Sequence, residues 1–124
     1  MKHSPEFLKL VNDAKKNIKE FTVLQVAEKI KSKEKFFFVD VREDDEFRQS
    51  HAEGSIHIGK GVIERDIENV IPDKSSEIVL YCGGGFRSAL AAEAIMKMGY
   101  KNVISMDGGI RRWMEAGLPL KSGG

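Results

Sequence analysis

Apolar residues near the start of the chain recur every three or four positions, which is the spacing of an amphipathic helix. This spacing predicts one helix over residues 4–21, where Pro5 suits the first helical position. A second helix is predicted over residues 23–30, because Thr22 and Gln25 have the spacing of a capping box. The chain therefore opens with two helices.

Further along, three continuous apolar runs have the composition of strands that are buried on both faces of a parallel sheet. They cover residues 36–41, 77–81 and 102–106. Helical patterns follow over residues 62–71, 88–98 and 110–116, each ended by a proline or glycine. This alternation predicts an α/β fold with a parallel sheet and helices on both faces. In such sheets, ligands bind beyond the carboxyl ends of the strands.

The segment that joins the second of these strands to a helix combines the only cysteine with three glycines and an arginine. Its residues are Cys82, Gly83, Gly84, Gly85, Phe86, Arg87 and Ser88. Glycines permit positive φ, which can turn successive N–H groups toward one point above the sulfur. Such a nest at a helix N-terminus attracts anions and favours the thiolate form of Cys82. Arg87 adds a fixed positive charge with planar donors that suit an oxyanion.

A simpler interpretation is that Cys82 is a small core residue and that the glycines only form a tight turn. Three consecutive glycines argue against it, because they give up side-chain packing and carry an entropic cost in the folded chain. One or two glycines would suffice for the turn. We therefore predict an anion-binding loop that carries a thiolate.

The composition narrows the functional classes. The chain has 124 residues, which fits one domain, and its single cysteine excludes an intramolecular disulfide and a CxxC redox pair. The net charge of +1 is unlike that of a nucleic-acid binder. Residues 1–35 hold nine lysines against five acidic residues, which we attribute to a solvated helix face, with a surface for a partner as the alternative. No apolar run could span a membrane and no secretory signal is evident, so we expect a cytoplasmic protein without membrane or nucleic-acid partners.

An ordered set of motifs extends over residues 22–119. It consists of Asp40-Val41-Arg42-Glu43, Glu46-Phe47, His51-x-x-Gly54-Ser55-Ile56-His57-Ile58, the loop from Cys82 to Arg87, and Gly108-Gly109-x-x-x-Trp113-x-x-Ala116-Gly117-x-Pro119. This set resembles a single-domain rhodanese. The resemblance implies a five-stranded parallel sheet flanked by helices and a sulfurtransferase whose cysteine carries a persulfide. We accordingly expect an N-terminal helical extension (1–21), a rhodanese-like domain (22–120) and a flexible tail (121–124).

The resemblance also implies roles for individual residues. Cys82 matches the nucleophile, and the loop from Gly83 to Ser88 matches the substrate cradle, in which Arg87 would hold the sulfonate of a donor such as thiosulfate. Loop N–H groups would stabilise the persulfide until an acceptor takes the sulfur. The expected partners are a small sulfur-donor anion and a cyanide, thiol or protein acceptor, with no metal or organic cofactor. The physiological donor and acceptor and the oligomeric state stay open.

Two other functions compete with this interpretation. The loop resembles that of cysteine-dependent phosphatases and arsenate reductases, but their pattern has five residues between cysteine and arginine, whereas four residues separate Cys82 from Arg87. In addition, no leaving-group acid is evident beside the loop. A persulfide carrier or interaction module with little free turnover is the stronger alternative. Phe86 and the N-terminal helix could then form its docking surface, although we expect Phe86 to pack over the loop instead.

Other polar and aromatic residues are interpreted as structural. Asp40 ends a buried strand, where its carboxylate needs a partner, and Arg42 is the natural one, so we expect a pair that lies near the loop. His51 and His57 lack the spacing of metal ligands on a helix and are expected to hold turns through hydrogen bonds. Core positions are expected for Trp113, Met96, Met98 and Met106.

Overall fold

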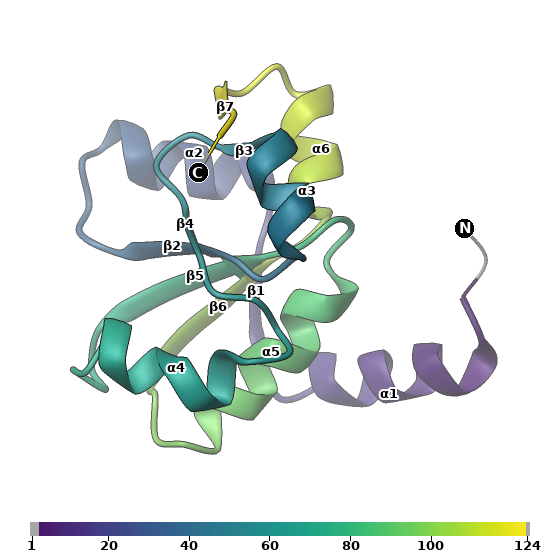
Figure 1. The fold of residues 1–124 in the computed structure, drawn as a ribbon. Helices are drawn as coiled ribbons and strands as arrows, with labels where there is room; N and C mark the ends of the chain where they lie inside the picture. The colour runs from purple at the N-terminus through teal and green to yellow at the C-terminus, as the bar shows by residue number, and fades with distance from the viewer. Residues whose placement is uncertain (1–2, 124) are drawn as a thin grey trace.

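A five-stranded parallel sheet lies at the centre of the protein, in a computed structural model that describes residues 3–123 (Figure 1). The strand order is β1-β6-β5-β2-β4. The strands are, in that order, Lys19–Phe21, Asn102–Met106, Glu77–Tyr81, Phe37–Asp40 and Ile56–His57. All neighbouring strands run parallel, so the predicted α/β fold with a five-stranded parallel sheet is confirmed.

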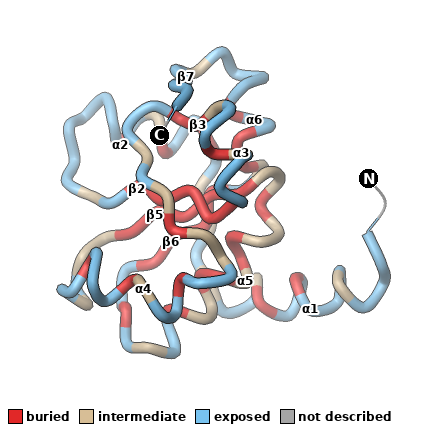
Figure 2. Tube along the Cα trace, in the orientation of Figure 1, coloured by how far each residue is buried: buried red, intermediate tan, exposed pale blue. Residues whose placement is uncertain are grey.

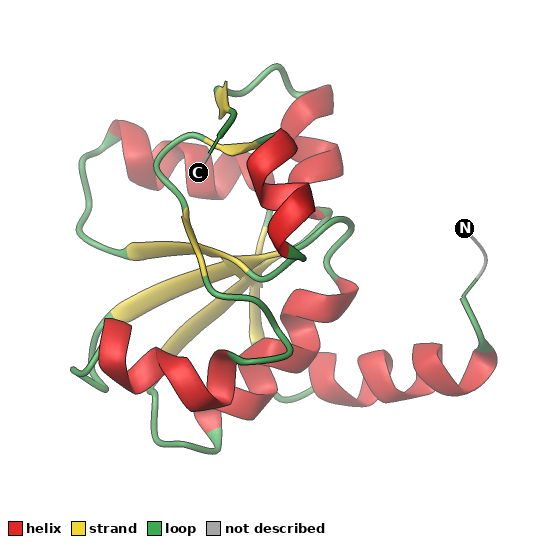
Figure 3. Ribbon diagram, viewed as in Figure 1, coloured by secondary structure: helices red, strands yellow, loops and turns green. Residues whose placement is uncertain are grey.

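Helices cover both faces of this sheet (Figure 3). One face carries α2 (Val23–Lys31), α3 (Asp44–Gln49) and α6 (Gly109–Glu115). The other face carries α1 (Pro5–Lys15), α4 (Ile63–Val70) and α5 (Phe86–Met96). A small antiparallel pair, β3 (His51–Ala52) and β7 (Leu120–Lys121), lies beside α3 and α6. The order of elements therefore places the carboxyl ends of β2 and β5 next to each other, where the cysteine loop begins.

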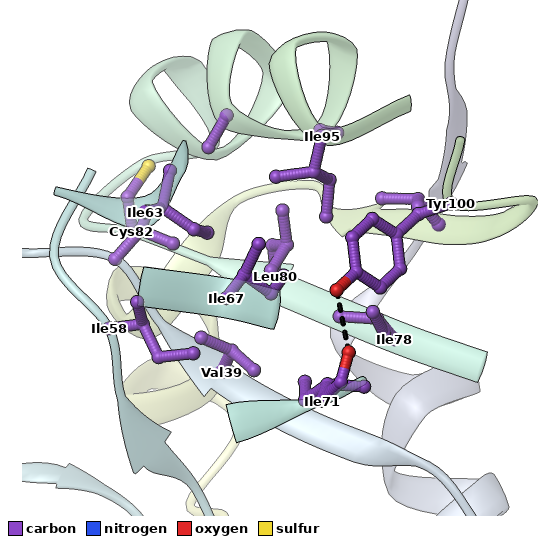
Figure 4. Close-up of a cluster of buried hydrophobic side chains, with 14 residues drawn as sticks. Val39, Ile58, Ile63, Ile67, Ile71, Ile78, Leu80, Cys82, Ile95 and Tyr100 are labelled. Atoms are coloured by element: carbon purple, nitrogen blue, oxygen red, sulfur yellow. Dashed lines mark hydrogen bonds between the residues drawn. The ribbon is translucent and has the colours of Figure 1, made fainter. Parts of the chain in front are cut away.

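Each face of the sheet packs its own hydrophobic cluster, and buried residues are concentrated along the strands (Figure 2). On the side of α4 and α5, Val39 and Leu80 from the strands meet Ile95 from α5 (Figure 4). Within this cluster Tyr100 donates a hydrogen bond to the carbonyl oxygen of Ile71, so its buried hydroxyl is satisfied. The sheet is thus covered on both faces, as its continuous apolar strands predict.

Trp113 occupies the second cluster, on the side of α2 and α6. It is buried, and its Nε1 donates to the carbonyl oxygen of Pro119 at 2.8 Å, which confirms the expected core position. Met106 is buried as well, and Met98 packs partly buried against the first cluster. The core position expected for Met96 is wrong, because this side chain is 37% exposed at the end of α5, where the helical turn directs Ile95 inward instead.

The first helix is shorter than its apolar spacing predicts. The helix expected over residues 4–21 ends at Lys15, and Lys19–Phe21 forms the edge strand β1, which pairs with β6. Asn17 lies in the turn between them, where its side-chain amide donates to Glu93 at 3.1 Å. Ile18 and Phe21 pack on the two different clusters rather than on one helix face. A strand of three residues is too short to show its own periodicity, so its apolar positions resembled a continuation of the helix.

The end of the chain also differs from expectation. The tail expected over residues 121–124 begins within β7, where Lys121 pairs with His51, and the Gly123 N–H donates to the carbonyl oxygen of Arg48 at 2.7 Å. Residues 121 and 123 are therefore held by hydrogen bonds rather than free, while residue 124 lies outside the described residues. The capping box of Thr22 and Gln25 is present as predicted.

Candidate active site

Cys82 follows directly after β5, at the carboxyl edge of the sheet, and is only 1% exposed. Its Sγ accepts hydrogen bonds from the backbone N–H groups of Gly85 at 3.1 Å and Ser88 at 3.3 Å. The loop between β5 and α5 thus curls back so that one of its amides and one from the first turn of α5 reach the sulfur. Amide dipoles that point at one atom stabilise negative charge on it.

The three glycines of this loop do different things. Only Gly85 has a positive φ, of 99°, so the expectation of several left-handed residues is wrong for Gly83 and Gly84. A Cβ on Gly83 would lie 3.3 Å from Nη2 of Arg87, so this glycine leaves room for the guanidinium. A Cβ on Gly84 would meet nothing within 4 Å. The turn itself therefore needs only one glycine. This agrees with the sequence-based argument that a tight turn alone does not explain three consecutive glycines.

Several amides of the loop have no acceptor. Within residues 3–123, no hydrogen-bond partner lies near the N–H groups of Gly83, Gly84, Phe86 and Arg87. The last two open α5, which is 11 residues long, so their amides also carry the positive end of its dipole. Unpaired amides beside a helix N-terminus form a site that suits an anion.

Arg87 does not present a free positive charge, because it is paired with Glu46 of α3. Its Nη1 and Nη2 lie 3.1 and 3.4 Å from the two carboxylate oxygens. Burial raises the pKa of Glu46, but hydrogen bonds from Arg87 and from the Glu43 backbone outweigh this and hold it below its ordinary value. The sequence predicts a positive charge on Arg87 but does not reveal the carboxylate that compensates it. A guanidinium has five N–H donors, and those not used by Glu46 remain for a ligand.

Glu46 is a site residue to which sequence reasoning gave no role, and its presence corrects the statement that no acid is evident beside the loop. It follows β2 and lies 41 positions before Arg87, so no local pattern connects the two residues. Its one visible signal is the spacing from Glu43, whose N–H it accepts at 3.0 Å in a capping box. That signal explains a helix start but not a catalytic site.

The loop forms one side of a cavity of about 710 Å³. The lining residues come from the loop, from α3 and α6, and from the N-terminal segment: Cys82, Gly83, Gly84, Phe86, Arg87, Glu46, Arg111, His3 and Phe7. Gly85 and Ser88, also predicted as site residues, do not line the cavity, but their N–H groups donate to the sulfur. Each of the seven predicted loop residues therefore either lines the cavity or donates to the Cys82 sulfur.

Phe86 contacts the N-terminal segment rather than folding back over the loop. Its ring centroid lies 4.9 Å from that of His3 and 6.2 Å from that of Phe7. On another side Nζ of Lys15 lies 5.4 Å from the Phe86 ring. The N-terminal helix is consequently part of the cavity wall.

Behind the sulfur lies a pair of buried hydroxyls. Ser88 Oγ is 3.6 Å from Cys82 Sγ and 2.8 Å from Ser105 Oγ, and neither serine is exposed. Ser105 belongs to β6 and was not predicted as a site residue. A polar residue inside an otherwise apolar strand was the signal that could have found it, because a buried hydroxyl needs a partner.

Asp40 and Arg42 form the expected pair, at the carboxyl end of β2. The carboxylate accepts from Arg42 Nε at 3.1 Å, from Nη2 at 2.7 Å and from the Arg42 backbone N–H at 2.8 Å. Burial lowers the pKa of Arg42, but its hydrogen bonds and proximity to Asp40 outweigh this and raise it. Nη2 also donates to the carbonyl oxygen of Ser50, so the pair joins β2 to the end of α3. Neither side chain lines the cavity.

The two histidines of the motif hold turns. His51 Nδ1 lies 2.8 Å from the carbonyl oxygen of Phe47, and His57 Nε2 lies 2.7 Å from that of Arg42. Among residues 3–123, no group of His, Cys, Asp and Glu is arranged to hold a metal ion. None of the helices in this part of the chain has the length and apolar character required to cross a bilayer.

The protein is therefore an α/β protein with a parallel sheet, helices on both faces, and a cysteine loop at the carboxyl edge of the sheet. Residues 22–116 match the family model of the rhodanese-like domain, and the chain belongs to this family. The putative sulfurtransferase YtwF of Bacillus subtilis is 33% identical over 96 residues, which are 77% of this chain and 90% of that protein. The putative sulfur carrier protein YrkF of the same organism is 33% identical over 97 residues, 78% of this chain, and the chain spans only 51% of its length.

Solved structures have the same fold. A Rhodopseudomonas palustris protein of unknown function, RPA3614, described as a possible tyrosine phosphatase, superposes with a TM-score of 0.86 at 28% identity over 98% of both chains. A thiosulfate sulfurtransferase from Pseudomonas aeruginosa superposes with a TM-score of 0.78 at 26% identity, over 86% of this chain and 20% of that one. The first match extends over nearly the whole chain, beyond the segment that the family model covers.

Proposed function

We propose that this protein is a sulfurtransferase in which Cys82 carries a persulfide between a sulfur donor and an acceptor. The observation that carries the proposal is the set of loop amides around one buried sulfur: two N–H groups reach Sγ, and four more lack an acceptor within the described chain. The relatives named as a putative sulfurtransferase and a putative sulfur carrier support it.

In the first step the Cys82 thiolate attacks the outer sulfur of a donor such as thiosulfate. The bond between Sγ and that sulfur forms, the sulfur–sulfur bond of the donor breaks, and sulfite leaves with the electron pair. The persulfide anion that remains extends from Sγ toward the cavity. The amides of Gly84 and Phe86 are available to it there, because the described residues leave them without acceptors.

In the second step an acceptor anion, cyanide or a thiolate, attacks the terminal sulfur. Its bond to that sulfur forms, the bond to Sγ breaks, and the electron pair returns to Cys82 as a thiolate. Charge is conserved in both steps, so no metal, oxidant or organic cofactor is required. The two half-reactions predict ping-pong kinetics.

Arg87 is proposed to bind the oxygens of the donor with those guanidinium donors that Glu46 does not use. Removing it would weaken one charge-assisted hydrogen bond and would free the Glu46 carboxylate in the cavity. Both effects oppose an anionic donor. Arg87→Ala should therefore raise the KM for thiosulfate by about tenfold.

Two alternatives are kept for the same site. A persulfide carrier with little free turnover is favoured by the relative named as a putative sulfur carrier. A phosphatase is favoured by the description of the Rhodopseudomonas palustris protein and by the carboxylate of Glu46 beside the loop. That carboxylate is a poor proton donor at neutral pH, because Arg87 holds its pKa below the ordinary value. The loop between cysteine and arginine is also one residue short of the phosphatase pattern.

One experiment tests all three functions. The protein is incubated with thiosulfate, desalted and measured by intact-mass spectrometry, then discharged with cyanide or a thiol while turnover is followed. We expect one added sulfur atom on the wild type, none on Cys82→Ser, and release of thiocyanate with cyanide. Loading without turnover would favour the carrier, and release of phosphate from an aryl phosphate without sulfur transfer would overturn the proposal.

A further inference from the structure

The cavity beside Cys82 is larger than the proposed small substrates need. Its volume is about 710 Å³, within the range of roughly 300–1,000 Å³ that holds organic ligands. Thiosulfate and cyanide would occupy only the part next to the sulfur. The rest of the cavity is bounded by residues outside the loop, and their chemistry indicates what else fits.

One wall of this space is aromatic, and two of its three rings come from outside the matched domain. His3 and Phe7 precede residue 22, where the family match begins, and their ring centroids are 5.3 Å apart. Both rings contact Phe86 at the start of α5, at the distances given above. Aromatic side chains in such clusters offer a large apolar surface to a ligand. We call these three residues the aromatic wall.

The aromatic wall is anchored by the rest of α1. Val11 and Ala14 are each 1% exposed, because this face of the helix packs on the domain next to α5. Lys15 adds ion pairs, with its Nζ 3.3 Å from Glu20 and 3.7 Å from Asp107. The helix therefore holds Phe7 at the cavity.

Another part of the cavity lining carries a positive charge. Arg111, at the start of α6, lines the cavity, is exposed, and has no ion-pair partner among residues 3–123. Its neighbour Arg112 instead pairs with Glu115 at 3.5 Å. Since Glu46 compensates Arg87, Arg111 is the cation of this cavity that remains available for a ligand's charge.

From these walls we propose that the sulfur acceptor is an organic thiol that joins an apolar body to a carboxylate. The apolar body would lie against the aromatic wall, the carboxylate near Arg111, and the thiol at the Cys82 sulfur. This inference rests on the proposed function. The acceptor thiolate attacks the terminal sulfur of the persulfide, its sulfur–sulfur bond forms, the bond to Cys82 breaks, and the electron pair returns to Sγ. The product is the acceptor's persulfide.

The test uses the full chain and three acceptors: 4-(mercaptomethyl)benzoate, benzyl mercaptan, which lacks only the carboxylate, and cyanide. Each variant is first loaded with thiosulfate and checked for one added sulfur by intact mass. We then measure kcat/KM for each acceptor and express it as a ratio to cyanide. For the wild type the ratio should be highest for the carboxylate thiol.

Two variants remove one wall each. Phe7→Ala should lower the ratio of both thiols to cyanide by about tenfold, because both lose an apolar contact. Arg111→Gln should lower the ratio of the carboxylate thiol to benzyl mercaptan by about fivefold, a small effect because Arg111 is exposed. Leu8→Ala on the same helix and Arg112→Gln on the same turn of α6 are the matched controls, since neither residue lines the cavity.

The outcomes separate this inference from the proposed function. A protein that takes up no sulfur fails the proposed function itself. If the protein takes up and transfers sulfur normally, but the kcat/KM ratios of Phe7→Ala and Arg111→Gln match those of the controls, only the acceptor assignment is wrong. If the aromatic wall only anchors α1, Phe7→Ala lowers Tm and leaves the acceptor ratios unchanged. Phe7→Leu should restore most of the ratio, because it keeps the position apolar.

Discussion

The position of the cysteine loop should depend on a glycine that lies outside it. Gly109, the first residue of α6, has a φ of 56°, and a Cβ built on it would lie 2.3 Å from the carbonyl oxygen of Cys82 and 2.6 Å from that of Gly83. At the same junction the N–H groups of Ile110 and Arg111 donate to these two carbonyls, at 2.9 and 3.1 Å. The start of α6 therefore holds the loop by backbone contact, with no space for a side chain.

The effect of Gly109→Ala follows from these distances. Ordinary contact to a Cβ begins at 3.4 Å, so a neighbour at 2.3 Å has to move by about 1.1 Å. Both clashing atoms belong to the backbone of Cys82 and Gly83, which carries the proposed nucleophile, and a displacement of this size costs roughly 100-fold in rate. Alanine in the left-handed region adds about 1–2 kcal/mol of strain, and the forced contact adds about 1–3 kcal/mol. We expect kcat/KM to fall about 100-fold and Tm to fall by roughly 4 °C per kcal/mol.

Gly117→Ala is the matched control for this variant. Gly117 follows the same helix, has a φ of 71°, and a Cβ on it would meet nothing within 4 Å. It therefore carries the same backbone strain without the clash. Both variants are compared by thiosulfate–cyanide kinetics, thermal unfolding and near-ultraviolet circular dichroism. A folded Gly109→Ala protein with kcat/KM within twofold of the Gly117→Ala protein would refute the reasoning.

Two further predictions concern the surroundings of the sulfur. Ser105→Ala removes the hydroxyl next to Ser88 and should slow sulfur loading of Cys82 about fivefold, since one hydrogen bond is worth ~1 kcal/mol. Loading is followed by intact mass over time, and Ser105→Thr should restore the rate. An unchanged rate in Ser105→Ala would contradict the prediction. The lowered pKa of Glu46 means that its pair with Arg87 stabilises the fold above the unfolded value near 4.5, and that this contribution is lost as the pH falls through the lowered pKa. Glu46→Gln should therefore lower Tm at pH 7, by the equivalent of less than about 1 kcal/mol, because the two side chains are 35% and 37% exposed. The difference in Tm should vanish in acid, and a difference that is constant with pH would count against the pairing.

The sequence predicted those elements whose signal is local. The strands Glu77–Tyr81 and Asn102–Met106 have the predicted boundaries, because each is a mostly apolar run that follows polar residues. The loop from Cys82 to Ser88 was predicted for the same reason, since its chemistry lies within seven consecutive residues. The strands β1, β3, β4 and β7 have two or three residues each and were not predicted, because so short a segment cannot show a period of two.

What the sequence did not reveal depends on contacts between distant segments. Glu46 meets Arg87 across 41 positions, and Ser105 meets Ser88 across 17. His3 and Phe7 line the cavity because α1 packs beside α5. The chain then continues into β1, the strand that the helical spacing did not predict. Each of these residues has an ordinary local explanation, as a cap, a strand residue or a helix face. Only the fold shows that they surround one sulfur.

The pairing of Arg87 with Glu46 changes how the site attracts an anion. The sequence suggested that one arginine supplies the charge, but the carboxylate compensates it, and the whole chain carries a net charge of only +1. Attraction at the sulfur must then come mainly from fixed amide dipoles, which need no counterion and act at short range in a buried site. Such a field would stabilise the proposed persulfide on Cys82 without attracting anions to the rest of the surface. Because the chain has no second cysteine, a persulfide held there also has no internal thiol with which to form a disulfide.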